Sequence, residues 1–326
     1  MKNNQLMIYG AYGYAGELMV REAVAQGLRP IIAGRDDEKL KPIATELSLE
    51  CRAFGVRNTG SNLQDISVLL NCAGPFSATA EPLARACLAQ QIHYLDITGE
   101  IDIFRKCHAL DEEARQQNVL ILPGAGTDIV PTDCLAAMLK EKLPVATRID
   151  LALSFGTNPS IGTVNTMIES FGKGGLIREG GMLKVVSNAF QMRKIPFQNK
   201  PQWAMTIPWG DVFTSGISTG VPDGAVYMAM PRMSIYMIRL TNPVKGILNT
   251  QFGQKITKRL AGWLMKKGPD AKALEAGRGQ FWGEAEAPDG EKLEMTMSTP
   301  NVYALTATVG IRIAQYCLDY TGPGGY

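Results

Sequence analysis

The sequence predicts an α/β protein: a Rossmann-type, doubly wound parallel sheet followed by a second α+β domain that contains a mixed or antiparallel sheet. Short apolar runs alternate with helical patterns through the first 128 residues. The first of these runs ends in a glycine-rich turn. At residues 148–153 the pattern changes to alternating polar and apolar residues, which is typical of a half-buried antiparallel strand.

The glycine-rich turn follows an apolar run, residues 6–9, that is too short for a helix. Gly10 permits a tight turn, Gly13 leaves room for a pyrophosphate, and Gly16 lets the next helix pack closely on the sheet. The N-terminus of that helix offers N–H groups and a partial positive charge to phosphates. We therefore predict a dinucleotide site formed by Gly10, Ala11, Tyr12, Gly13, Tyr14, Ala15 and Gly16.

The end of the second predicted strand, residues 31–33, indicates which dinucleotide binds. NAD enzymes carry an Asp or Glu there, about 20 residues past the glycine turn, to bind the ribose 2′-hydroxyl. This chain has Gly34 and Arg35 instead, and a guanidinium pairs well with a 2′-phosphate. The pattern favours NADP, with NAD as second choice, and the alternative for Arg35 is a solvated surface cation. Asp36 and Asp37 are expected to cap the following helix.

The rest of the first domain repeats the strand–helix unit. Further strands are predicted at 50–56, 67–71, 92–97 and 119–122. A helix from Thr79 to Gln90 would carry Pro82 in its first turn. One helix opening after Glu100 has an apolar stripe formed by Ile103, Cys107, Leu110 and Ala114.

Ligands of such sheets lie beyond the carboxyl ends of the strands. Residues after the fourth strand are small or apolar and would lie against the nicotinamide half of the cofactor: Cys72, Ala73, Gly74, Pro75 and Phe76. The acid/base candidates at strand ends are Asp96, Glu100 and Asp128. For each of these three, helix capping is the alternative interpretation.

We place the first domain at residues 1–128, rejoined by residues 299–326 through an amphipathic helix, and a substrate and dimerisation domain at 129–298. The second domain is expected to contain a strand at 148–153, a helix ending at Phe171, and a hairpin of 281–287 with 292–298. Strands interrupted by Gly220 and by residues 222–224 are expected between 209 and 230. Arg178 is a candidate anchor for a substrate carboxylate or phosphate.

Composition excludes several function classes. The net charge of +2 gives no indication of nucleic-acid binding. The six cysteines form no Cys-x-x-Cys motif and the two histidines, His93 and His108, have no ligand spacing, so we expect no metal site. We expect a reduced, cytoplasmic location with no signal peptide and no membrane span.

Residues 249–267 have an apolar helical face and five cations: Lys255, Lys258, Arg259, Lys266 and Lys267. A basic amphipathic helix with a tryptophan is typical of a peripheral membrane anchor. The simpler alternative, which we favour, is that its apolar face packs on its own domain or on a second subunit. We expect a homodimer.

The chain carries the motifs GAYGYAG, IIAGR, NCAGPF, HYLDITGE, PGAGTDIVPTD, PSIGT and PWGDVFTSGISTG. Together they resemble the saccharopine dehydrogenase-like oxidoreductases, a group related to saccharopine reductase and the trans-acting enoyl reductases. The resemblance implies an NAD(P)-binding fold followed by an α+β domain with a mixed sheet. It selects no substrate within the group.

We therefore predict an NADP(H)-dependent oxidoreductase that transfers a hydride to or from a C=C, C=O or C=N group of an unidentified small-molecule or acyl-type substrate. The alternative is a non-catalytic NAD(P)-binding sensor or scaffold.

Overall fold

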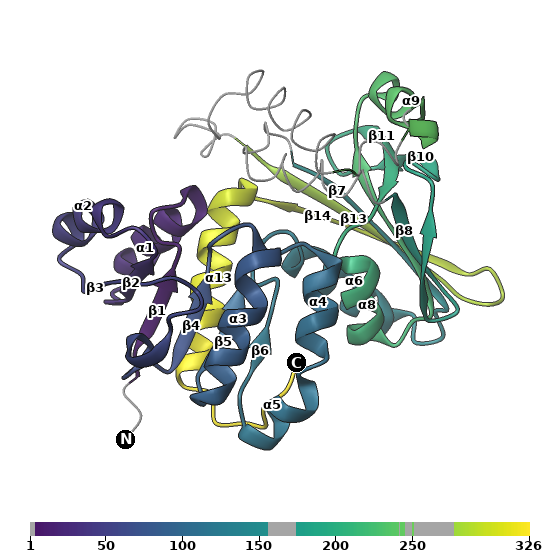
Figure 1. Ribbon diagram of the computed structural model, residues 1–326. Coiled ribbons are helices and arrows are strands. Elements are labelled where there is room, and N and C mark those ends of the chain that lie inside the picture. Colours follow the sequence, from purple (N-terminus) through teal and green to yellow (C-terminus); the bar gives the residue numbers. More distant parts are fainter. Residues whose placement is uncertain (1–3, 156–173, 241, 245–249, 251–276) are drawn as a thin grey trace. The chain divides into compact units, whose positions relative to one another are not determined.

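The computed structural model describes residues 4–155, 174–240, 242–244, 250 and 277–326 (Figure 1). The chain divides into two compact units. Unit 1 comprises the chain up to Asp128 together with Tyr303–Tyr326, and unit 2 runs from Ile129 to Val302. The last helix, α13 (Val302–Leu318, yellow in Figure 1), therefore belongs almost entirely to unit 1.

Unit 1 contains a six-stranded sheet in the order β3-β2-β1-β4-β5-β6, and every neighbouring pair is parallel. This is the strand order of a Rossmann fold and confirms the predicted doubly wound sheet. The last four strands are each shorter than predicted, most of all those near residues 50 and 120. The bounds are β1 Leu6–Tyr9, β2 Ile31–Gly34, β3 Cys51–Ala53, β4 Val68–Asn71, β5 His93–Asp96 and β6 Ile121–Leu122.

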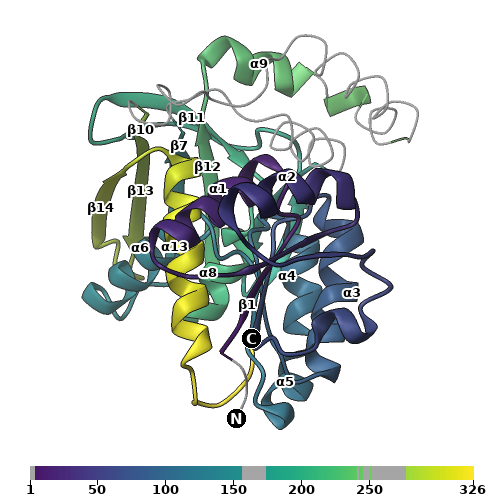
Figure 2. The same cartoon turned by 90° about the vertical axis from the view of Figure 1, so that its left-hand side faces the viewer.

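Alternate residues of the strands enter two hydrophobic clusters, one on each face of the sheet. Met7 and Tyr9 contribute to one cluster, and Leu6 and Ile8 to the other. The first cluster includes side chains of α3 (Phe76–Ala89), α4 (Ile101–His108) and α5 (Asp111–Gln117). The second includes side chains of α1 (Tyr14–Ala25), α2 (Asp37–Leu47) and α13, which lies beside α1 (Figure 2).

Two helix predictions in unit 1 need correction. Helix α3 begins at Phe76, directly after Pro75, so Pro82 lies beyond its first turn. The single helix expected after Glu100 is two helices, because the chain turns at Ala109 and Leu110 between α4 and α5. The four stripe residues are nevertheless all buried, because the apolar spacing continues across the turn.

Unit 2 contains an eight-stranded mixed sheet in the order β10-β11-β12-β7-β13-β14, with β8 paired to β12 and to β9. Only β7 and β12 run parallel among the pairs described, which confirms the predicted mixed sheet. The strands are β7 Arg148–Ser154, β8 Gly175–Glu179, β9 Met182–Val186, β10 Met192–Pro196, β11 Pro201–Ile207, β12 Asp223–Ala229, β13 Gly279–Glu286 and β14 Lys292–Thr299. The predicted hairpin is β13–β14.

Two predictions in unit 2 are wrong. Strand β7 is buried from Ile149 to Ser154, not half-buried, because it lies between β12 and β13. Its buried Asp150 forms ion pairs with two partly exposed arginines, Arg148 at 2.9 Å and Arg193 at 3.4 Å, so the polar positions of the pattern reflect ion pairing. Residues 211–219 form helix α8 (Asp211–Thr219), not a strand; Gly220 ends it with a φ of +68°.

The other helices described in unit 2 are α6 (Val130–Lys142) and α9 (Arg232–Leu240), with a short 3-10 turn, η2 (Asn242–Val244). A 3-10 turn in unit 1, η1, spans Gly60–Leu63. The helix expected to end at Phe171, the PSIGT motif and nearly all of the basic stretch 249–267 lie outside the described residues. Within the described part, no helix is long and apolar enough to cross a membrane.

Candidate cofactor and active site

The glycine turn between β1 and α1 has the close packing that its sequence predicts. Gly10 has a φ of +84°, and a Cβ added to it would lie 2.7 Å from the backbone nitrogen of Ala73. A Cβ on Gly16 would lie 2.2 Å from the carbonyl oxygen of Gly10. Glycine is therefore required at both positions for steric reasons within the protein itself.

Gly13 is different, because its backbone is ordinary, with φ −76° and ψ 159°. It occupies the N-cap position of α1, and no side chain caps that helix. The first N–H groups of α1 have no intrahelical partners and carry the positive end of the helix dipole. A bare N-cap at the carboxyl end of β1 fits a dinucleotide pyrophosphate.

The other residues of the turn surround this N-cap. Ala11 is fully buried, and its N–H donates to the carbonyl of Ala33 at 3.2 Å. Tyr12 is half-buried, and Ala15 lies in the first turn of α1. Tyr14 is exposed and packs edge-to-face against Tyr303 at a ring distance of 5.2 Å.

At the end of β2, Arg35 is exposed, as a ligand for a 2′-phosphate must be. Asp36 lies immediately before α2, and its carboxylate pairs with Lys39 at 3.1 Å. Asp37 is the first residue of α2 and pairs with Lys41 at 2.7 Å. Arg35 follows β2, and the glycine turn follows β1. Because these strands are parallel, both segments lie at the same edge of the sheet.

The loop after β4 lies against the glycine turn. The Cys72 N–H donates to the Tyr9 carbonyl at 2.8 Å, and Ala73 approaches Gly10 closely. The Thr79 hydroxyl, from the first turn of α3, donates to the Ala73 carbonyl at 2.6 Å. Burial raises the pKa of the Cys72 thiol far above its usual value, so Cys72 stays protonated. Gly74, Pro75 and Phe76 lead from this loop into α3.

A buried hydrogen-bond chain connects this loop to two others. Asn71 Oδ1 accepts from the Ala73 N–H at 3.0 Å, and Asn71 Nδ2 donates to the Tyr94 hydroxyl at 3.1 Å. Tyr94 donates to Asp96 Oδ2 at 2.8 Å. Asp96 Oδ1 accepts from the N–H groups of Thr98 and Gly124 at 3.0 and 2.9 Å.

Asp96 is completely buried, with 0% of its surface exposed. Burial raises its pKa to about 6, although its hydrogen bonds from Thr98, Gly124 and Tyr94 act in the opposite direction. With both oxygens bonded inside the protein, Asp96 holds the loops after β5 and β6 in place. The structure thus gives this candidate a positioning role.

Asp128 and Glu100 lie on the two loops that Asp96 connects. A Cβ on Gly99 would lie 3.2 Å from Asp128 Oδ2, so the Asp128 carboxylate sits directly against the Gly99 backbone. Desolvation raises the pKa of Asp128 to about 7. Glu100 precedes α4 and is half-buried, and its N–H donates to the Thr98 hydroxyl at 3.1 Å. The pKa of Asp128, about 7 against about 6 for Asp96, is closer to the neutral value that suits an acid/base group.

Arg178 does not have the surface position expected of a substrate anchor. It is 4% exposed, on β8 of unit 2. Its guanidinium donates to the carbonyls of Val212 and Val221 and to the Ser215 hydroxyl. This burial could not be predicted, because the contacts come from α8 and the residues after it, where the sequence pattern predicts strands.

The two histidines have structural surroundings in unit 1. His93 Nδ1 accepts from the Leu120 N–H at 3.0 Å, and His108 packs edge-to-face against Tyr326 at a ring distance of 5.1 Å. No group of three His, Cys, Asp or Glu side chains among the described residues could hold a metal ion. All six cysteines are free thiols.

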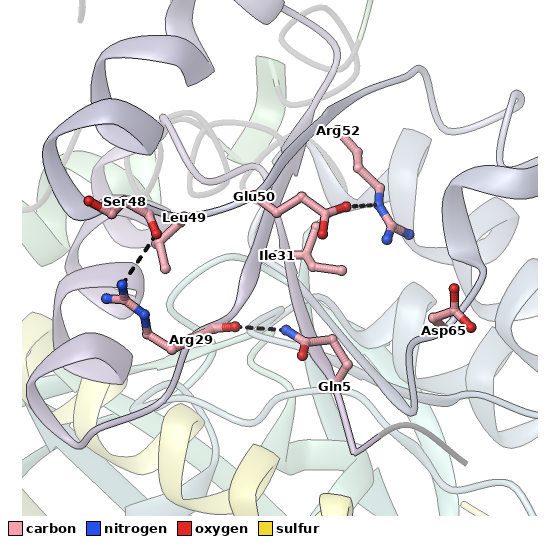
Figure 3. Close-up of a pocket in the computed structure, with 8 residues that line it drawn as sticks. All are labelled: Gln5, Arg29, Ile31, Ser48, Leu49, Glu50, Arg52 and Asp65. Atoms are coloured by element: carbon pink, nitrogen blue, oxygen red, sulfur yellow. Dashed lines mark hydrogen bonds and ion pairs between the residues drawn. The ribbon is translucent and has the colours of Figure 1, made fainter. Parts of the chain in front are cut away.

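A cavity of about 410 Å³ lies at the opposite edge of the same sheet (Figure 3). Gln5 and Arg29 precede β1 and β2, and Glu50 precedes β3, so the cavity is at the amino ends of the strands. Its polar groups already pair with one another: Gln5 with the Arg29 carbonyl and Arg52 with Glu50. This cavity is therefore separate from the dinucleotide loops.

Sequence reasoning missed Asn71, Tyr94, Thr98 and Thr79, which hold the loops together. Asn71 and Asp96 are the last residues of two neighbouring buried strands and form a register pair. Asn71 could have been predicted, because it is a polar residue at the end of an otherwise apolar parallel strand. Tyr94 offered none, because an aromatic residue within a strand is ordinary.

Residues 6–122 match the model of the saccharopine dehydrogenase NADP binding domain. A saccharopine dehydrogenase-like oxidoreductase of Rattus norvegicus is 25% identical over 231 residues, 62% of this chain and 53% of the relative. A trans-acting enoyl reductase of Mycobacterium tuberculosis is 28% identical over 205 residues, 56% of this chain and 44% of the relative. The chain thus spans about half the length of the curated relatives it matches.

Among solved structures, apo saccharopine dehydrogenase (L-Glu forming) of Saccharomyces cerevisiae matches with a TM-score of 0.66 at 10% identity. The match covers 98% of this chain and 93% of the yeast chain. At this identity the match establishes the fold. The resemblance to the saccharopine dehydrogenase-like oxidoreductases, and the two-part fold it implied, are confirmed.

Proposed function

We propose that the protein is an NADP(H)-dependent oxidoreductase of the saccharopine dehydrogenase-like group, acting on a C=C, C=O or C=N group of a small-molecule or acyl-type substrate. The observation that carries the proposal is the position of Asp128. A carboxyl with a pKa of about 7 lies on a loop at the same sheet edge as a bare helix N-cap suited to a pyrophosphate.

The bound cofactor would supply or accept a hydride. The chain's own residues divide the remaining work. Gly13 and the N-terminus of α1 bind the pyrophosphate, and Arg35 binds the 2′-phosphate. Cys72–Phe76 border the nicotinamide half. Asp128 gives a proton to the reduced substrate or takes one from the substrate being oxidised, and Asp96 keeps the Asp128 loop in place.

NADPH binding and turnover test this proposal separately. Titration of the protein fluorescence with NADPH measures binding, and NADPH oxidation is followed at the nicotinamide absorbance with imines, enoyl thioesters and ketones. Binding with turnover of one class supports the enzyme and identifies its substrate chemistry. Binding without turnover of any class favours the alternative, a non-catalytic NADP-binding sensor or scaffold.

We further propose a cytoplasmic homodimer. Six free thiols are compatible with a reducing compartment. The apolar face of the basic stretch 249–267 is expected to pack on its own domain or on a second copy of the chain, and the alternative is contact with an anionic membrane surface. Light scattering after size exclusion measures the dimer, and co-sedimentation with anionic and neutral vesicles at low and high salt measures membrane contact. A monomer that stays in the supernatant contradicts both the homodimer and the membrane contact.

A further inference from the structure

The ring of Tyr12 occupies the space where a side chain at the end of β2 would lie. A Cβ added to Gly34 would stand 2.6 Å from Tyr12 Cε1 and 3.3 Å from Cδ1. The backbone just before Tyr12 is fixed against β2, because the N–H groups of Gly10 and Ala11 both donate to the Ala33 carbonyl, at 2.7 and 3.2 Å. No residue other than glycine fits at position 34 unless the Tyr12 ring moves.

This packing bears on the choice between the two nicotinamide cofactors. An Asp or Glu near the end of the second strand is what recognises the ribose 2′-hydroxyl of NAD. In this chain Tyr12 keeps a carboxylate out of position 34. The neighbouring Arg35 is exposed.

A second cation lies over the same ring. Lys39 lies in the first turn of α2, and its Nζ is 5.6 Å from the centre of the Tyr12 ring and 3.1 Å from Asp36 Oδ2. The Lys39 side chain is 64% exposed. Both of its present contacts are of the weak, solvent-exposed kind. Replacing these two contacts by one to a dianionic phosphate therefore costs Lys39 little free energy.

We propose that Tyr12 and Lys39 are specificity residues for NADP: Tyr12 excludes a carboxylate from the end of β2, and Lys39 joins Arg35 in binding the 2′-phosphate. This inference rests on the proposed function, because it assumes that NADP binds to the glycine turn.

The role of Lys39 is tested by fluorescence titration of Lys39→Ala with NADPH and NADH. An exposed charge-assisted contact is worth about 1 kcal/mol, so the Kd for NADPH rises about fivefold while that for NADH is unchanged. The matched control is Lys41→Ala on the same helix, which pairs with Asp37 and Glu38 and leaves both affinities unchanged. Equal weakening of both cofactors by Lys39→Ala overturns the role of Lys39.

The role of Tyr12 is tested by a double-mutant cycle of Gly34→Asp and Tyr12→Ala, with far-UV circular dichroism and thermal midpoints to establish folding. Gly34→Asp alone weakens NADPH binding and gains nothing for NADH. In the Tyr12→Ala background the new carboxylate has room, and NADH affinity rises about tenfold over Gly34→Asp alone. Gly55→Asp is the control, because a Cβ there meets nothing within 4 Å.

The results separate the inference from the proposed function. A wild-type protein that binds neither nucleotide overturns both. A wild type that prefers NADPH, combined with the same effect of Gly34→Asp in both backgrounds, overturns the role of Tyr12 and leaves the proposed function standing.

Discussion

The Tyr94 hydroxyl donates to Asp96 Oδ2 at 2.8 Å inside unit 1, where neither side chain has any exposed surface. The same hydroxyl accepts from Asn71, and Asp96 accepts from two backbone N–H groups. One buried phenol thereby joins the loop after β4, Cys72–Phe76, to the loop that leads to Asp128. Side chains in such a network act as a unit.

Replacing Tyr94 by Phe tests this connection. The variant loses two buried hydrogen bonds, and we expect the free energy of unfolding to fall by about 1–3 kcal/mol. Because the loops lose their common support, kcat should also fall by at least tenfold. Steady-state kinetics and urea unfolding measure the two effects.

Tyr9→Phe is the matched control, because the Tyr9 hydroxyl donates only to the Phe54 carbonyl among the bonds described, at 2.9 Å. It should lose stability with little change in kcat. Equal kcat losses in both variants would mean that Tyr94 contributes stability alone.

The pH dependence of the reaction reports on Asp128. Its folded pKa is raised from 3.8 to about 7 by desolvation, so the folded state retains a proton that the unfolded chain releases above pH 4. Stability contributed by this group is therefore present below the unfolded pKa and lost as the pH rises toward 7. In the reductive direction, where Asp128 donates a proton, kcat should fall above pH 7.

Asp128→Asn should remove the pH dependence that this group gives to stability and to kcat. Its kcat should be about 10²–10⁴ times lower than wild type, with no decline above pH 7 that depends on this group. Its stability at pH 8, measured by urea unfolding, should equal or exceed that of the wild type, because no buried charge remains. An Asn variant that keeps the wild-type pH profile would exclude Asp128 as the acid.

The sequence predicted unit 1 better than unit 2 for a physical reason. Parallel strands buried on both faces are continuous apolar runs, and β4 was recognised in this way. Strand β7 is just as buried, but Arg148 and Asp150 interrupt its apolar residues and mimic the alternation of a half-buried strand. The pairing that neutralises Asp150 involves Arg193, which is distant in the sequence.

The sequence predicts those candidate residues whose position follows from the backbone alone. Gly10, Gly13 and Gly16 are placed by the turn, and Asp96 and Asp128 by the strand ends. The positioning role of Asp96 follows from its hydrogen-bond partners: Tyr94 and Thr98, two residues away on either side, and Gly124 in the loop after β6. That these three groups meet at one carboxylate depends on the folded loops and could not be predicted from spacing.

Arg178 gives a prediction for unit 2. Replacing it with Met removes the donors for two buried carbonyls, and we expect the free energy of unfolding to fall by about 2–4 kcal/mol. NADPH affinity should be unchanged, because the predicted nucleotide residues all lie in unit 1. Lys184→Ala, an exposed lysine paired with Glu179 on the neighbouring strand, is the control and should change stability by less than about 0.5 kcal/mol. A stable Arg178→Met protein with a raised substrate KM would restore the anchor interpretation.

Substitutions at Gly13 and Gly16, two glycines of the same turn, should have opposite effects on cofactor binding and on stability. A Cβ on Gly13 would lie 3.2 Å from the Gly10 carbonyl oxygen, a tight contact that a shift of a few tenths of an ångström relieves. The backbone there suits any residue, so Gly13→Val should fold. It should nevertheless lose NADPH binding, because the side chain enters the space that the pyrophosphate requires. Gly16→Ala places a Cβ 2.2 Å from the same oxygen, so it should lower the thermal midpoint before any ligand is added. Circular dichroism with NADPH titration separates the two effects. A Gly13→Val protein that binds NADPH as the wild type does would show that the nucleotide lies elsewhere.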